Sequence, residues 1–99
     1  MLFMILAKDK ADSVDVRMAT RSAHLDYIAN AGDRLKFAGP LLTPGADPQP
    51  IGSMIVIDAA SEGAVQLFAD NDPYVHAGLF QSVEIRPWKA AVGAWVPTA

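Results

Sequence analysis

His24 and Asp72 are the two side chains best suited to catalysis in this sequence. A histidine titrates near neutral pH, and a carboxylate bonded to one ring nitrogen would fix its tautomer and raise its basicity. The other ring nitrogen could then move a substrate proton. We therefore predict His24 as a general acid/base and Asp72 as its orienting partner. Asp33 is the competing partner, and a half-exposed helix histidine without a catalytic role is the alternative for His24.

Two arginines lie at helical spacing from His24 and are candidates for binding an anionic substrate. Arg17, Arg21 and His24 stand at positions i, i+4 and i+7, so a helix would present them as one cationic stripe. A guanidinium is rarely buried without a paired anion, because its desolvation costs several kcal/mol. We predict that Arg17 and Arg21 hold a substrate anion. The alternatives are a solvated helix face or structural ion pairs with Asp72 or Glu84.

Ser53 and Tyr74 complete the predicted substrate-binding set. Ser53 leads into an apolar run, and Tyr74 follows Asp72 by two positions. The structural alternatives are a strand-edge hydroxyl for Ser53 and a packing residue for Tyr74. The sequence has no cysteine and two isolated histidines, so it offers no disulfide framework, thiolate metal site or histidine cage. We therefore expect no metal ion and no other cofactor.

Residues 71–80 predict a tight turn and a short helix. Asp72 can cap the first turn through its carboxylate, and Pro73 suits the first helical position. Gly78 can end the turn in a left-handed conformation. Capping alone would explain Asp72, so the segment could be only a connector. A contact with His24 would give it a second role.

Length and composition indicate one small domain with a partner subunit. Of 99 residues, 52% are hydrophobic and 19% are charged, against roughly a quarter charged in an average globular chain. A net charge of -3 without a run of lysine or arginine argues against nucleic acid and against a membrane-surface helix. The apolar run Met1–Ala7 is short and lacks a basic lead, so we expect no signal peptide or membrane span and a cytoplasmic location.

Hydrophobic periodicity predicts six regular elements. In chain order they are a strand over 2–6, a helix over 13–31, a strand over 33–44, a strand over 54–57, a helix over 62–70 and a strand over 81–86. The runs 2–6 and 54–57 lack alternation, which is typical of strands covered on both faces. On the first helix, an apolar arc predicts the face that packs on the sheet; it comprises Val14, Met18, Leu25, Ile28 and Ala29. Ser61 is the predicted N-cap of the second helix.

The order β, α, β, β, α, β is that of the ferredoxin-like fold, an α+β arrangement with a four-stranded antiparallel sheet and both helices on one face. Helices on one face leave the other face of two apolar strands uncovered. A second copy packed sheet to sheet is the simplest cover. We therefore predict a homodimer, or a higher oligomer built from it, that forms an α+β barrel. Residues 1–99 are one domain, with a core over about 1–89 and an apolar tail, 90–99, that packs on its own chain or on a partner.

Several short motifs together resemble the YCII-like family. They are Arg21-Ser22-Ala23-His24-Leu25, Ala38-Gly39-Pro40-Leu41, Ile51-Gly52-Ser53, Asn71-Asp72-Pro73-Tyr74-Val75, Ala77-Gly78-Leu79 and Ile85-Arg86-Pro87-Trp88. The resemblance covers the chain up to about Lys89. It implies a dimeric α+β barrel of ferredoxin-like protomers and an active site that pairs the helix histidine, here His24, with the aspartate of the Asp-Pro-Tyr motif, here Asp72.

The resemblance also suggests a class of reaction. Enzymes of similar barrel architecture isomerise, eliminate from or oxygenate ring compounds, often without a metal, which is an analogy at the level of fold. We therefore predict a cofactor-independent lyase or isomerase that acts on a small anionic, aromatic or lactone-like compound. The alternative is a dimeric module that binds a small metabolite, or assists a larger enzyme, without catalysis.

Overall fold

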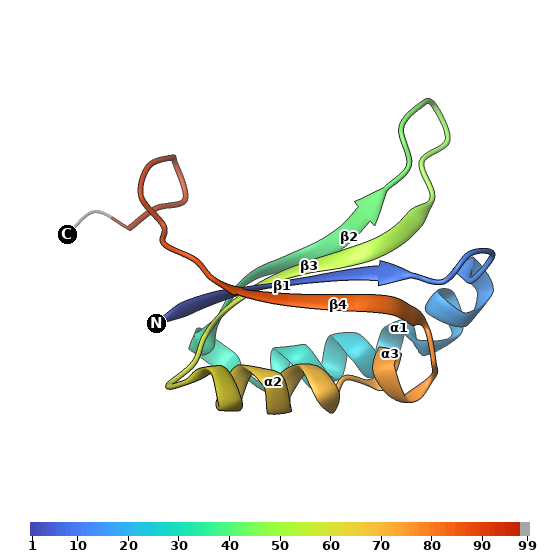
Figure 1. The fold of residues 1–99 in the computed structure, drawn as a ribbon. Helices are drawn as coiled ribbons and strands as arrows, with labels where there is room; N and C mark the ends of the chain where they lie inside the picture. The colour runs from blue at the N-terminus through green and yellow to red at the C-terminus, as the bar shows by residue number, and fades with distance from the viewer. Residues whose placement is uncertain (98–99) are drawn as a thin grey trace.

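Four antiparallel strands form one sheet in the computed structural model, which describes residues 1–97 (Figure 1). The elements are β1 (Leu2–Asp9), α1 (Val14–Ala29), the 3-10 turn η1 (Gly32–Arg34), β2 (Leu35–Leu42), β3 (Pro50–Asp58), α2 (Glu62–Asp70), α3 (Pro73–His76) and β4 (Phe80–Pro87). The strand order is β2-β3-β1-β4, and the helices lie on one face of the sheet. This arrangement confirms the predicted ferredoxin-like α+β fold. The last two residues of the predicted tail, 98 and 99, lie outside the described residues.

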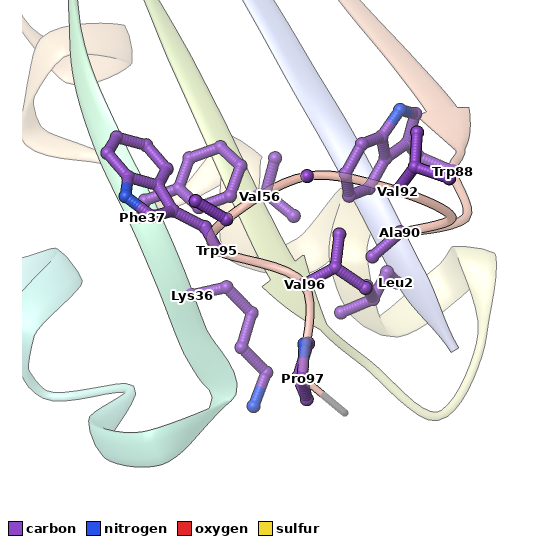
Figure 2. Close-up of a pocket in the computed structure, with 12 residues that line it drawn as sticks. Leu2, Lys36, Phe37, Val56, Trp88, Ala90, Val92, Trp95, Val96 and Pro97 are labelled. Carbon is purple, nitrogen blue, oxygen red and sulfur yellow. The ribbon is translucent and has the colours of Figure 1, made fainter. Parts of the chain in front are cut away.

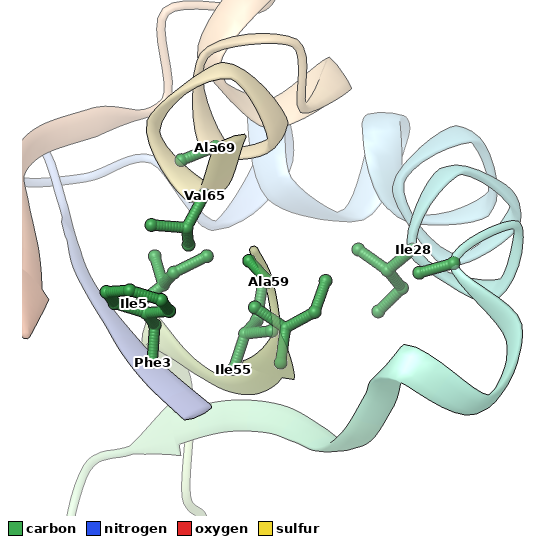
Figure 3. Close-up of a cluster of buried hydrophobic side chains, with 9 residues drawn as sticks. Phe3, Ile5, Ile28, Ile55, Ala59, Val65 and Ala69 are labelled. Atoms are coloured by element: carbon green, nitrogen blue, oxygen red, sulfur yellow. The ribbon is translucent and has the colours of Figure 1, made fainter. Parts of the chain in front are cut away.

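The hydrophobic core lies between the sheet and the helices (Figure 3). Side chains alternate along β1, so that Ile5 points to the helices and lies opposite Ile55 of β3 and Ile85 of β4. The buried cluster comprises Phe3, Ile5, Ile28, Ala31, Ile55, Ile57, Ala59, Val65 and Ala69. Burying one side chain of isoleucine size contributes about 1.5–3 kcal/mol. This cluster therefore fixes α1 and α2 against the two central strands.

Among the described residues, no helix lies over the opposite face of the sheet (Figure 1), which is apolar along the two central strands. Met4 and Leu6 of β1 point to this face beside Met54 and Val56 of β3. Met4, Leu6 and Met54 remain half-buried, whereas Val56 is buried. Both central strands are thus apolar on both faces, as their unbroken hydrophobic runs predicted.

The segment after β4 crosses one end of this open face (Figure 2). The Phe37 ring lies 6.4 Å from that of Trp88 and 5.5 Å from that of Trp95, measured between centroids. A cavity of about 620 Å³ separates the segment from the sheet. Val92 and Trp95 remain 91% and 82% exposed. Within the described residues, the tail therefore packs on its own chain but buries little of its apolar surface.

The packing face of α1 differs from the predicted apolar arc. Met18 and Leu25 are 56% and 40% exposed, whereas Arg17, His24 and Ile28 are buried. The prediction was confirmed for Ile28 but wrong for Met18 and Leu25, because it assigned burial by apolar character alone. The two polar side chains are buried because carboxylates of other elements lie beneath the helix.

Capping side chains and glycine conformations set the ends of the helices. The first helix is shorter than the predicted 13–31, since Asn30 ends it and Gly32, at φ +60°, opens the 3-10 turn. The second helix has the predicted bounds, and Ser61 Oγ accepts a hydrogen bond from the Ala64 N–H at 3.1 Å. The strand predicted over 54–57 is longer, as β3 begins at Pro50. No helix in the described part of the chain has both the length and the apolar content of a membrane span.

Gly52 allows β1 and β3 to approach each other. A Cβ at this position would overlap the backbone oxygen of Ala7 and lie 3.0 Å from Leu41 Cδ1. Gly39, in the neighbouring strand β2, has no atom within 4 Å of the corresponding position. The first glycine is therefore required by packing, and the second is not.

We predict that Gly52→Ala lowers the free energy of unfolding by about 1–3 kcal/mol, the usual cost of overpacking. The matched control Gly39→Ala should change it by less than about 1 kcal/mol, because nothing obstructs the added methyl group. Urea denaturation followed by circular dichroism measures both values. Equal stability of the two variants would contradict the close approach of β1 to β3.

Candidate active site

His24 and Asp72 meet where α1 packs against α3. The His24 Nδ1 atom lies 2.8 Å and 2.9 Å from the two carboxylate oxygens of Asp72. Both side chains are buried, with 8% and 5% of their surface exposed. Asp33, the competing partner in the sequence, instead accepts a hydrogen bond from Lys36 Nζ through its backbone carbonyl. The structure thus pairs His24 with Asp72.

The Asp72 carboxylate has two partners. Its Oδ1 atom accepts a hydrogen bond from the Tyr74 N–H at 2.9 Å, which caps α3, and it also contacts the His24 ring. Pro73 occupies the first helical position, and Gly78 follows the helix at φ +71°. The cap fixes the carboxylate, and the carboxylate fixes the imidazole. The Asp72 carboxylate therefore caps α3 and contacts His24 at the same time.

Tyr74 packs directly on the imidazole. The rings of His24 and Tyr74 are stacked with centroids 4.0 Å apart and planes inclined by 18°. The Arg17 guanidinium carbon lies 4.6 Å from the centre of the Tyr74 ring, a cation–π distance. Burial raises the pKa of the Tyr74 hydroxyl above its ordinary value, although the charge of Arg17 opposes this shift. Tyr74 is therefore a neutral phenol at physiological pH.

Arg17 is held by Asp9, a residue that was not among the predicted site residues. Arg17 Nε and Nη2 donate to the two Asp9 oxygens at 2.7 Å and 2.8 Å, and Nη2 also donates to Ser53 Oγ at 2.8 Å. Burial alone would lower the pKa of Arg17. The hydrogen bonds and the charge of Asp9 raise this pKa by more than burial lowers it, so that the net shift is upward. The alternative ion pairs with Asp72 or Glu84 were wrong for this arginine.

A period of two along β1 could have identified Asp9. Phe3, Ile5, Ala7 and Asp9 occupy alternate positions, and all four are buried on the helix-facing side. The strand predicted over 2–6 ended too early to include Asp9, because charged residues follow the apolar run. An acidic residue in phase with three inward apolar residues is instead a signal for a buried ion pair.

A cavity of about 250 Å³ lies against these side chains. It is lined by Arg17, Met18, Arg21, His24, Leu25, Ile28, Ala38, Gly39, Pro40, Leu42, Pro50, Ser53 and Tyr74. Because Asp72 occupies Nδ1, Nε2 is the ring nitrogen of His24 left for a ligand. Arg21 is exposed and, among residues 1–97, forms no salt bridge. All six predicted site residues thus line the cavity or, in the case of Asp72, contact one that does.

His76 and Trp88 do not line this cavity, and both are exposed. Within the described residues, no three histidine, cysteine, aspartate or glutamate side chains lie close enough to hold a metal ion.

The chain is similar to bacterial proteins over nearly its whole length. It is 39% identical over 97 residues to Protein YciI of Escherichia coli O6:H1, covering 90% of this chain and 97% of that protein. It is 31% identical to an uncharacterized protein of Haemophilus influenzae, with the same coverage.

A solved structure supports the same relationship. The fold superimposes with a TM-score of 0.87 on 5-chloro-2-hydroxyhydroquinone dehydrochlorinase from Burkholderia phenoliruptrix AC1100, solved in complex with 2,5-dihydroxybenzoquinone. The two chains are 34% identical, and the match covers 92% of this chain and 96% of the other. The YCII-related domain matches residues 1–89, which contain every residue of the candidate site. The chain therefore belongs to the YCII-related family.

Proposed function

We propose that the chain is a small-molecule enzyme of the lyase or isomerase type, which moves a proton with His24 and Asp72 and needs no cofactor. The observation that carries this proposal is the buried contact between His24 Nδ1 and the Asp72 carboxylate at the wall of a cavity. The site thereby combines a base, His24, with a carboxylate that orients it, Asp72, and a cavity that can hold a ligand. The similarity to a dehydrochlorinase, an elimination enzyme by its name, supports the same reaction class.

The proposed step begins at His24 Nε2, which accepts a proton from a hydroxyl group or a carbon of the substrate. The electron pair left behind forms a new double bond. In an elimination, the leaving group departs with its bonding pair; in an isomerisation, the imidazolium returns the proton to another substrate atom. The Asp72 carboxylate at Nδ1 stabilises the transient imidazolium and holds the tautomer that leaves Nε2 able to accept a proton.

Arg17 and Ser53 are proposed to bind a substrate oxygen. Ser53 Oγ accepts a hydrogen bond from Arg17, so its hydroxyl hydrogen can be donated to a ligand. An oxygen that loses its proton gains negative charge, which prearranged donors stabilise. Asp9 fixes Arg17 in place through two hydrogen bonds. These donors therefore need no rearrangement when the charge develops.

The cavity favours a single small ring. Its volume of about 250 Å³ lies just below the ~300–1,000 Å³ that is typical of small-molecule pockets, so it suits a small ligand. Leu25, Pro40 and Leu42 supply apolar walls, whereas the hydrogen-bonding groups belong to Arg17, His24 and Ser53, among others. Apolar walls with a few polar groups are typical of sites that bind small organic molecules. We therefore propose an aromatic or lactone-like substrate.

We also propose that the chain forms a homodimer through the open face of the sheet. Met4, Leu6 and Met54 would be only half-buried in an isolated protomer. Contiguous exposed apolar surface of this kind is characteristic of protein interfaces. Two such sheets packed face to face would enclose the apolar surface between them and leave the helices outside.

For the site, we predict that His24→Asn lowers kcat by about 10²–10⁴-fold, the usual contribution of a general acid/base. Asp72→Asn should lower kcat by at least about tenfold but keep the helix cap, since asparagine caps helices as well as aspartate does. The assay is halide release or quinone absorbance with hydroxylated and halogenated ring compounds, beginning with the substrate named for the dehydrochlorinase relative.

Circular dichroism and unfolding curves would show that both variants are folded. Undiminished turnover by folded His24→Asn would exclude the proposed mechanism. If the wild-type protein binds ring compounds in the cavity but converts none of them, the non-catalytic binding module becomes the better description.

For the dimer, we predict that Leu6→Lys converts the protein to monomers, because an ammonium group would be buried between the two sheets. The matched control Leu67→Lys introduces the same charge on α2, where the leucine is already 64% exposed, and should leave the dimer intact. Size-exclusion chromatography with light scattering measures both masses. A monomeric wild-type protein, or a dimeric Leu6→Lys variant, would refute this interface.

A further inference from the structure

We infer that the substrate carries its negative charge at the Arg21 side of the cavity and presents a neutral hydroxyl group to His24. The inferred ligand is a small ring with an acidic substituent and, separated from it across the ring, a hydroxyl group. This inference rests on the proposed function, since it assigns the orientation of a ligand in the same site. It gives Arg17 and Arg21 different roles, although the sequence predicted the same role for both.

The inner wall of the cavity does not offer a net positive charge. Arg17 is neutralised by Asp9, which takes two of its hydrogen bonds at 2.7 Å and 2.8 Å. Asp72 lies behind a histidine that must be neutral to act as a base, and Tyr74 is a neutral phenol. The two buried carboxylates therefore outnumber the one buried guanidinium. An anionic group placed here would meet excess negative charge in a poorly solvated site.

Donors are still available at this inner wall. Ser53 and Arg17 can donate to a neutral oxygen, and His24 Nε2 can accept its proton. A substrate hydroxyl is thus recognised before the reaction, and its oxygen becomes negatively charged only as the proton moves to His24. The inner wall is suited to a charge that develops during the reaction rather than one that the substrate brings.

Arg21 places a positive charge at the outer edge of the cavity. It lines the cavity, is exposed, and forms no salt bridge within the described part of the chain. It lies one helical turn from Arg17, about 6 Å along the helix axis, which is comparable to the width of a substituted ring. Leu25 and Leu42 line the same cavity and give the ring apolar contacts. A carboxylate at the outer edge would therefore reach the one cation of the cavity that has no anion of its own among residues 1–97.

Binding of two probes of the same shape tests this inference. Para-hydroxybenzoate is an anion at neutral pH, and para-hydroxybenzamide is its neutral counterpart. We expect the wild-type protein to bind the acid about 3- to 10-fold more tightly than the amide, a range suited to a partly exposed ion pair. In Arg21→Gln the two dissociation constants should become equal. Titrations followed by NMR chemical shifts measure all four constants.

The control variant Arg34→Gln removes the same charge from an exposed residue that does not line the cavity. It should keep the full preference for the acid. A preference that survives Arg21→Gln, an equal affinity of the wild-type protein for both probes, or no binding of either probe would overturn the inference. Repeating the titrations with His24→Asn separates this result from catalysis, since the charge preference should persist in a protein without turnover.

Discussion

The burial of an arginine and a histidine on the inner face of α1 is the constraint on which the site depends. Arg17 and His24 lie where a helix of this fold would ordinarily place apolar residues. A guanidinium in such a position costs several kcal/mol unless an anion accompanies it. Asp9, the last residue of β1, supplies that anion, and Asp72, the cap of α3, supplies the partner of His24. The helix, a strand end and a short turn are therefore held in register by two polar contacts.

The fold could be predicted from the sequence because short stretches of neighbouring residues determine its strands and helix ends. Unbroken apolar runs identified the two central strands, and Ser61, Asp72 and Gly78 marked helix ends through capping and turn chemistry that needs only a few neighbouring residues. The element order then restricted the topology. The contact of His24 with Asp72 was predicted for a different reason, namely the chemical complementarity of the two side chains together with the family resemblance.

The packing face of α1 and the partner of Arg17 could not be predicted in the same way. Met18 and Leu25 are as apolar as the residues of the core, but nothing in their types shows that they border a cavity instead. The partner of Arg17 depends on a tertiary contact between β1 and α1, which no local signal reports. Continuing the period of two along β1 would have placed Asp9 on the inner face, yet only the three-dimensional structure shows which cation lies above it.

The sharing of one Asp72 oxygen between the α3 cap and His24 couples local order to reactivity. A four-residue helix has few hydrogen bonds of its own, and α3 is instead anchored by the buried side chains of Asp72 and Tyr74. In the proposed enzyme, any displacement of this single turn would therefore also move the carboxylate away from the imidazole.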